Sequence, residues 1–213
     1  MVETQVTYGV VAHVARKSMA DKLISRLGAV SHFDDGSLGS NANHDLVWRE
    51  ASRDASDWVC ILEDDAVISD SFESDLCVAL SNAPRRSVIG LYVGGERPPQ
   101  WQHRVLKAAA KADAAGAAWL SCDTLLWGVG VALPVELVGP MLSTVEYSDA
   151  PYDFRLGRWA ILNRLPVYYP WPSILDHSDP PTLIDHKDGA PRDRPRVAIR
   201  TGKGGTNSKA VKI

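Results

Sequence analysis

The chain has 213 residues, 45% of them hydrophobic, which is enough for one sizeable core or for a domain with a small appendage. Its formal net charge of −3 excludes a protein that binds polyanions over its whole surface. No apolar run approaches the roughly 18 residues of a membrane span, and residues 1–23 lack the pattern of a signal peptide, so we expect a cytoplasmic protein with no membrane span.

The first half of the chain alternates short apolar runs with amphipathic segments. The expected strands are residues 6–14, 29–33, 57–62 and 87–93. The expected helices are residues 17–28, 43–56 and 70–81. Gly28 suits the end of the first helix, and Asp70 and Glu73 have capping-box spacing at the start of the third. This alternation predicts an α/β domain with a mostly parallel central sheet and helices on both of its faces.

The second half is less regular. Residues 94–103 form a Gly- and Pro-bearing segment, which we expect to be a lid or acceptor loop, and the Ala-rich residues 104–120 are left unassigned. A buried strand at 125–133 and two helices, from Pro134 to about 145 and at 152–165, should follow. Pro-rich extended chain then ends the domain, which we place at 1–186. Residues 187–213 carry eight Lys or Arg against two Asp, and we expect them to form a basic, flexible tail.

Three carboxylates in a row, Glu63, Asp64 and Asp65, follow the expected strand at 57–62. We call them the acidic cluster. In an open α/β sheet, ligands gather at the carboxyl ends of the strands, which is where the cluster falls. Adjacent carboxylates repel and raise one another's pKa, and a divalent cation relieves that repulsion. The pattern therefore indicates a metal site; the alternative is that Asp64 and Asp65 only cap the next turn in water.

The sequence "ILEDDAVIS" after such a strand resembles the acidic metal-binding motif of GT-A-fold glycosyltransferases. The nearest resemblance is to glycosyltransferase family 25 and to related small phage-encoded transferases. Other pieces follow in the order that this family uses, so that the resemblance covers residues 5–186. They are "VAHVAR" (11–16), "DDGSLGSNANH" (34–44), "LLWGVGVALP" (125–134), "PYDFRLGRW" (151–159) and "VYYPWPSILDHSDPPTLI" (167–184). The chain departs from the family at 131–133, where the family carries a tyrosine.

The resemblance implies a GT-A (Rossmann-like) single domain that moves a sugar, as a hexosyltransferase does, from a UDP-sugar to an acceptor hydroxyl. Stabilising the leaving diphosphate calls for Mn²⁺ or Mg²⁺ held by one or two carboxylates. We expect Asp65 and Asp64 to bind this metal and Glu63 to support them or to accept a sugar hydroxyl. A late His is a frequent third ligand in such folds, and we prefer His177 to His186 because it follows a stiff Pro-bearing stretch.

Nucleotide binding should use the end of the first strand, where the backbone of Ala12 and His13 and the guanidinium of Arg16 can meet phosphate or ribose. Asp34 and Asp35 can accept hydrogen bonds from a uracil or a ribose, although Asp-Asp-Gly is also a strong turn signal. His44, near a helix start, can face the nucleotide or help to cap the helix. Arg16 can equally be a solvated residue of a first helical turn.

Transfer that inverts the sugar also needs a base for the proton of the acceptor hydroxyl. The resemblance points to Asp153, which matches the acceptor-side Asp of the family, and Asp149 comes next. The competing role for Asp153 is a helix-dipole partner.

The acceptor is open: a protein, a glycan, or DNA with a hydroxymethylated base, which the basic tail can contact. If the protein is phage-encoded, its location would be the host cytoplasm. The alternatives to a transferase are a Mg-dependent phosphotransferase or hydrolase on a Rossmann-like fold and a catalytically inactive nucleotide- or glycan-binding module.

Overall fold

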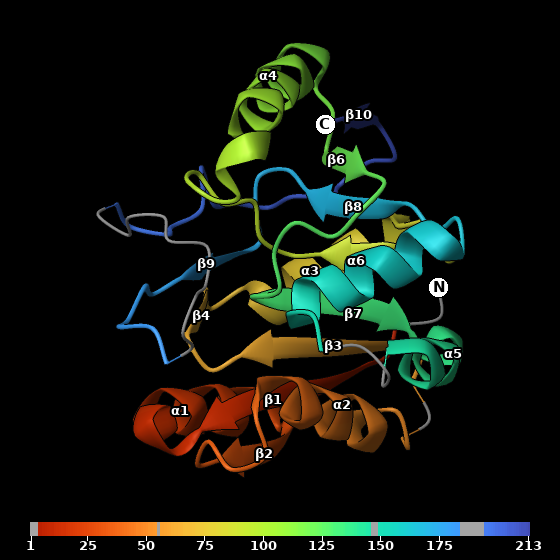
Figure 1. The fold of residues 1–213 in the computed structure, drawn as a ribbon. Helices are drawn as coiled ribbons and strands as arrows, with labels where there is room; N and C mark the ends of the chain where they lie inside the picture. Colours follow the sequence, from red (N-terminus) through yellow and green to blue (C-terminus); the bar gives the residue numbers. More distant parts are fainter. Residues whose placement is uncertain (1–3, 55, 146–148, 184–193) are drawn as a thin grey trace.

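A computed structural model describes residues 4–54, 56–145, 149–183 and 194–213. Its centre is an eight-stranded sheet with the order β10-β6-β8-β5-β7-β3-β1-β2 (Figure 1). A small second sheet pairs β4 with β9. The strands are β1 (Val6–His13), β2 (Val30–Asp34), β3 (Trp58–Glu63), β4 (Ala66–Ile68), β5 (Val88–Gly90), β6 (Trp119–Cys122), β7 (Gly130–Pro134), β8 (Val167–Pro170), β9 (Leu175–His177) and β10 (Ala210–Lys212).

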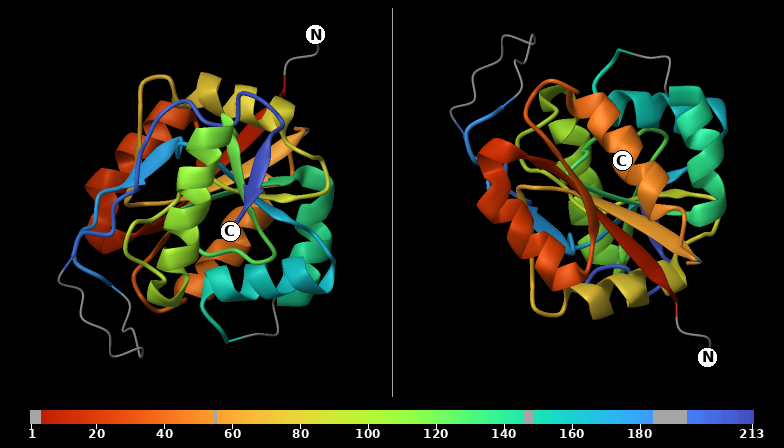
Figure 2. Two further views of the ribbon diagram at one scale, coloured as in Figure 1. Left: turned by 90° about the horizontal axis from the view of Figure 1, so that it is seen from above. Right: turned by 90° about the horizontal axis from the view of Figure 1, so that it is seen from below.

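Helices cover both faces of the large sheet (Figure 2). They are α1 (Lys17–Leu27), α2 (Ser40–Ala51), α3 (Phe72–Asn82), α4 (Pro99–Ala115), α5 (Val135–Val145) and α6 (Tyr152–Leu162). The views from above and below place α1 and α3 on one face and α2, α5 and α6 on the other. The predicted α/β class, with a mostly parallel sheet and helices on both faces, is thus confirmed.

The central strands are parallel where the sequence predicts βαβ units. β1 pairs in parallel with β2 and with β3, while β7 runs antiparallel to β3 and to β5. Five of the six residues of β3 are buried, as expected for a strand covered on both faces. The carboxyl ends of β1, β2 and β3, at His13, Asp34 and Glu63, therefore lie at one edge of the sheet, which we call the carboxyl edge.

Some local predictions were wrong. The segment expected to be a loop at 94–103 becomes helical at Pro99, because Pro suits a first helical turn and the Ala-rich residues after it continue the helix to Ala115. The helix predicted at 70–81 starts at Phe72 after Ser71, so Asp70 and Glu73 form no capping box. By contrast, α1 ends at Gly28 in the left-handed conformation, with φ of 59°, as predicted.

The C-terminal residues differ most from the prediction. Residues 194–213 are packed against the domain, and β10 adds a parallel strand next to β6 at the edge of the sheet. Ile213 is buried, and its backbone N–H donates to the carbonyl of Ser121. The expected flexible tail is therefore not found in this part, whereas residues 187–193 lie outside the described residues. Composition suggested a solvated tail, but the apolar residues among the cations give it surface to bury.

No helix in the ranges described combines the length and the apolar character needed to cross a bilayer.

Candidate active site at the carboxyl edge

The acidic cluster stands at the carboxyl edge, as the sequence predicts. Glu63 is the last residue of β3 and pairs with Val11 of β1. Asp64 and Asp65 form the turn between β3 and β4, yet they are only 5% and 3% exposed. They are therefore not the solvated capping residues of the alternative interpretation. Buried carboxylates need partners, because a low-dielectric interior penalises their charge.

Among the residues that the structure describes, Arg16 is the cation that pairs directly with these carboxylates. Its Nη1 lies 3.0 Å from Asp64 Oδ1 and 2.6 Å from Asp65 Oδ2. The backbone N–H of His13 donates to the other Asp64 oxygen at 2.9 Å. Asp65 Oδ1, by contrast, is buried and has no hydrogen-bond partner. One guanidinium thus serves two carboxylates and leaves one carboxylate oxygen free.

His177 reaches the cluster because β9 pairs with β4. Ala66 lies opposite His177 in this small sheet, and the N–H and hydroxyl of Ser178 both donate to the carbonyl of Asp65. His177 Nε2 is 3.3 Å from Asp65 Oδ2. Its Nδ1 accepts the backbone N–H of Asp179 at 2.9 Å. Since a backbone N–H can only donate, Nε2 carries the ring proton and donates to Asp65.

The electrostatics of the three carboxylates differ. Burial, together with the charges of Asp65 and Asp153, raises the pKa of Glu63. Burial also raises the pKa of Asp64, against the hydrogen bonds from His13 and Arg16. For Asp65, burial is outweighed by the hydrogen bond from His177 and by the guanidinium of Arg16, so its pKa is lowered. Asp65 is therefore the carboxylate that stays charged most readily.

Glu63 lies beside a group of packed aromatic rings, those of His44, Tyr152 and Trp48. His44 Nε2 lies 3.8 Å from Glu63 Oε1, and the His44 ring stacks on Tyr152 with centroids 3.8 Å apart. Trp48 fixes Tyr152 by donating its indole N–H to the phenol oxygen at 2.9 Å. A Cβ at Gly128 would come within 3.3 Å of Glu63 Oε1, so glycine there leaves space for the carboxylate. Burial lowers the pKa of His44 to about 4.

Asp153 approaches the same region from the first turn of α6. Its Oδ1 accepts the N–H of Phe154 at 2.9 Å, and burial raises its pKa. The helix is anchored below it by Arg155, whose guanidinium forms a two-pronged pair with Asp45 at 3.0 and 3.1 Å. The charge of Asp153 contributes to the raised pKa of Glu63.

The predicted nucleotide-binding residues fall into two groups. His13 and Arg16 touch the acidic cluster, whereas Asp34, which lies opposite His13 in the sheet, ties its own loop together. Asp34 accepts the backbone N–H groups of three loop residues, at 3.0 Å each, and these bonds lower its pKa against the effect of burial. Hydrogen bonds from Ser37 likewise lower the pKa of Asp35. The Ala12 carbonyl already accepts the side-chain amide of Asn43.

The two aspartates fit a divalent cation in chemistry and in charge. Two buried carboxylates share one guanidinium, and Asp65 Oδ1 is an unpartnered oxygen of the kind that divalent cations bind. His177 fits less well as a ligand, because its Nε2 carries a proton and Nδ1 is occupied. Within the described ranges, no group of three or more His, Cys, Asp or Glu is arranged as a metal site. The metal prediction for Asp64, Asp65 and His177 remains a prediction, and His186 lies outside the described residues.

The comparison with protein families bears on this geometry directly. Residues 14–103 match the family model of glycosyltransferase family 25 (LPS biosynthesis protein). The predicted resemblance to glycosyltransferase family 25 is confirmed over these residues. The matched stretch runs from the turn after β1 into α4 and includes Arg16, His44 and the whole acidic cluster. It supports glycosyltransferase activity. No curated protein matches the chain.

Sequence reasoning missed several residues that surround this candidate site. Trp48, Tyr152 and Arg155 were not singled out from the sequence, yet Trp48 holds Tyr152 and Arg155 pairs with Asp45. Arg196 was placed in a flexible tail, yet its Nε lies 2.6 Å from Asp179 next to the His177 strand. The sequence offers a weak signal for this pairing, the two acids near His177 in "LDHSDPP", which a cation can neutralise.

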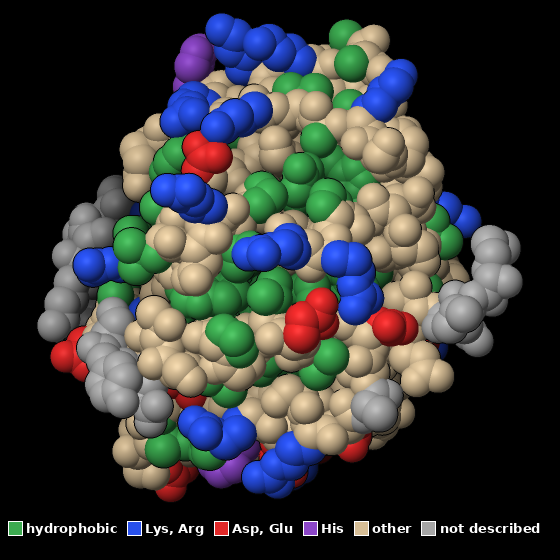
Figure 3. Space-filling model, turned by 90° about the vertical axis from the view of Figure 1, so that its right-hand side faces the viewer, with side chains coloured by type: hydrophobic (Ala, Val, Ile, Leu, Met, Phe, Trp, Pro, Cys, Tyr) green, Lys and Arg blue, Asp and Glu red, His purple; other side chains and the backbone are tan. Residues whose placement is uncertain are grey.

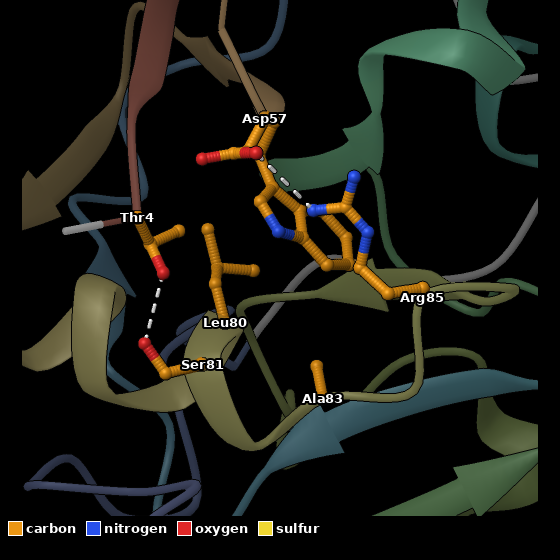
Figure 4. Close-up of a pocket in the computed structure, with 7 residues that line it drawn as sticks. Thr4, Asp57, Leu80, Ser81, Ala83 and Arg85 are labelled. Atoms are coloured by element: carbon orange, nitrogen blue, oxygen red, sulfur yellow. Dashed lines mark hydrogen bonds and ion pairs between the residues drawn. The ribbon is translucent and has the colours of Figure 1, made fainter. Parts of the chain in front are cut away.

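A surface pocket lies at the amino end of β3, the end opposite to Glu63 (Figure 4). Its wall includes Thr4, Asp57, Trp58, Leu80, Ser81, Ala83 and Arg85. Arg85 lies 3.7 Å from Asp57 and over the Trp58 ring. The space-filling view of this end of the molecule shows cationic and anionic side chains side by side (Figure 3). Trp58 and Glu63 stand at opposite ends of β3, roughly 16 Å apart, so this pocket is separate from the acidic cluster.

Proposed function

We propose that the protein transfers a sugar, as a hexosyltransferase does, from a UDP-sugar to an acceptor hydroxyl. One observation carries the proposal. A cluster of three carboxylates, with a buried and unpartnered oxygen on Asp65, stands at the carboxyl edge inside the segment that matches a glycosyltransferase family. A sheet edge of this kind is where α/β proteins bind nucleotides.

Mn²⁺ or Mg²⁺ bound here would stabilise the negative charge on the leaving diphosphate. Asp64 and Asp65 would hold the ion, and His177 would orient Asp65 through its Nε2–H. His13 keeps Asp64 in place through its backbone N–H. These roles use only contacts between the chain's own residues.

Asp153 is our candidate for the base. In a single displacement its carboxylate takes the proton of the acceptor hydroxyl while that oxygen bonds to the anomeric carbon, and the bond to the diphosphate oxygen breaks with its electron pair. A raised pKa suits this role because the carboxylate then holds the proton better near neutral pH. Glu63, held beside Gly128 and His44, is placed to accept a sugar hydroxyl.

Among the proposed acceptors, the structure gives least support to DNA. That idea relied on free cations in the C-terminal segment. Arg196 and Arg200 instead pair with Asp179 and Asp113 at 2.6 and 2.5 Å, and Arg194 lies 3.6 Å from Glu96. Lys187 and Arg192 lie outside the described residues. A glycan or a protein is therefore the acceptor class that we would test first.

The test is release of UDP from a panel of UDP-sugars, with Mn²⁺ and with glycan acceptors or, as a slow background, water. We expect UDP as the product, and the chelator EDTA should stop its release. Release of inorganic phosphate instead would favour a hydrolase. If no sugar nucleotide in the panel binds to the protein or is turned over, the transferase proposal fails.

A further inference from the structure

Arg16 occupies the position between the two carboxylates that the metal would use. It ends the short 3-10 turn Val14–Arg16 after β1, and its side chain is only 14% exposed. The same nitrogen, Nη1, bonds Asp64 Oδ1 and Asp65 Oδ2. Asp65 Oδ1 has no hydrogen-bond partner, but both Asp64 oxygens are occupied, one by Arg16 and one by the His13 N–H. An ion that bridges the two aspartates therefore meets the oxygen of Asp64 that Arg16 now holds.

The charge of the cluster is nevertheless not balanced by Arg16. Two carboxylates, Asp64 and Asp65, share its one guanidinium, and His177 meets Asp65 as a neutral donor. Asp65 Oδ1 is left buried without a partner. A buried, unpaired acceptor is costly, and this one points to a second cation beside or in place of the guanidinium.

Arg16 also holds a third element. Its Nη2 donates to the carbonyl of Pro181 at 2.8 Å, in the segment that follows β9. Ser178 and Asp179 in the same segment bond to Asp65 and His177. The guanidinium therefore links the segment after β9 to the acidic cluster, and its departure would free both the carboxylates and the Pro181 carbonyl.

From this geometry we propose that Arg16 and a divalent cation compete for Asp64 and Asp65, and that Arg16, once displaced, binds the diphosphate of the donor. The inference rests on the proposed function for its second half only. A guanidinium is well suited to the exchange because it binds carboxylates and phosphates in the same forked geometry. In the protein without metal, the guanidinium of Arg16 then takes the place of the ion between Asp64 and Asp65.

The first test measures Mn²⁺ binding alone, by calorimetry, without nucleotide. Arg16→Gln should bind Mn²⁺ about tenfold more tightly than the wild type, the order of factor that one charge-assisted hydrogen bond is worth. Arg16→Lys should fall between the two, since an ammonium keeps the charge but loses the planar fork. The matched control is Lys17→Gln, which removes a neighbouring cation that pairs with Asp21, at the protein surface, and should change the affinity less than twofold.

The second test adds UDP at saturating Mn²⁺. Arg16→Gln should now bind UDP about tenfold more weakly than the wild type, so that one substitution moves the two affinities in opposite directions. An Arg16→Gln variant whose Mn²⁺ affinity is unchanged or weaker overturns the competition. Unchanged UDP affinity overturns the diphosphate role. If the wild type does not bind UDP at all, the proposed function fails, while the Mn²⁺ titration still decides the competition.

A measurement on the wild type covers the case in which Arg16→Gln does not fold. Diamagnetic Mg²⁺ should shift the Nε–Hε resonance of Arg16 in a nitrogen–proton NMR spectrum, because the guanidinium leaves the carboxylates. A resonance that stays in place while Asp64 and Asp65 signals respond to Mg²⁺ would contradict the exchange.

Discussion

The two ends of β3 carry similar residues in very different surroundings. At the carboxyl end Arg16 meets Asp64 and Asp65, and all three side chains are nearly buried, at 14%, 6% and 5% exposure. At the amino end Arg85 meets Asp57, and these side chains are 53% and 42% exposed. Water screens the second pair, which makes it worth little, whereas the first group must compensate its charges within the protein. Burial, and not the residue types, marks the candidate site.

The largest effect expected at the carboxyl end of β3 is on the rate of sugar transfer. Asp153→Asn should lower the rate by about 10²- to 10⁴-fold, the amount that loss of a general base costs, with UDP and metal affinity nearly unchanged. The measurement is the transfer rate with the true acceptor, together with calorimetric UDP binding. A variant that works at full rate would leave Asp153 as a helix-dipole partner and move the search to Asp149 or Glu63.

The site should also reduce the stability of the protein in acid. Burial lowers the pKa of His44 to about 4. Below about pH 6.5, His44 is therefore protonated in the unfolded chain but stays neutral in the folded protein until the pH approaches 4. Stability should therefore fall between about pH 6.5 and about 4, by up to about 3 kcal/mol from this group. His44→Phe keeps a ring on Tyr152 and should remove that part of the pH dependence.

Urea unfolding of both proteins at pH 7 and pH 4.5 measures this effect. His103→Phe, a substitution of an exposed histidine on α4, is the matched control and should leave the pH dependence as it is. The account of His44 is wrong if His44→Phe and the wild type lose the same free energy of unfolding on acidification.

A smaller effect concerns the orientation of Asp65. His177→Ala should weaken Mn²⁺ binding by about 10- to 100-fold, the usual cost of removing a group that orients a metal ligand. His186→Ala should have less effect. Mn²⁺ titrations of the two variants decide between them, and an equal loss, or a loss only in His186→Ala, would reverse the assignment.

The smallest effect is expected at the amino end of β3. Arg85→Ala removes a contact with the Trp58 ring and two long ion pairs, at 3.7 Å to Asp57 and 3.6 Å to Glu136. The free energy of unfolding should change by less than about 1 kcal/mol, and UDP affinity should not change. A large loss of UDP affinity in this variant would put the pocket of Figure 4, and not the acidic cluster, at the centre of function.

The sequence predicted those parts of the fold and site that depend on local pattern. The apolar run before Glu63 predicted a buried strand, and Gly28 predicted the end of a helix. Both are local signals, and both predictions are confirmed. The approach of His177 to Asp65 was expected from family resemblance and needs the β4–β9 pairing, which no periodicity reveals. The same is true of Arg16, whose two carboxylate partners stand 48 and 49 residues further along the chain.

In the C-terminal segment, by contrast, local composition led to a wrong prediction. Its composition, rich in cations and glycine, is typical of solvated chain, yet β10 completes the sheet and Arg196 pairs with Asp179. Four of its described cations, Arg194, Arg196, Arg200 and Lys212, form ion pairs with acids elsewhere in the folded domain. Such pairings over long sequence distances cannot be read from composition. Residues far apart in the sequence therefore decide both the edge of the sheet and the surroundings of the site.

The most direct test of the account is calorimetric titration of UDP, with and without Mn²⁺, into the wild type, Asp65→Asn and Arg85→Ala. If the donor binds at the acidic cluster through a metal, the wild type and Arg85→Ala should bind UDP only with Mn²⁺, and Asp65→Asn should lose this binding while its melting temperature stays within a few degrees. UDP affinity that is the same in Asp65→Asn as in the wild type, with and without EDTA, would contradict the metal and the placement of the donor together.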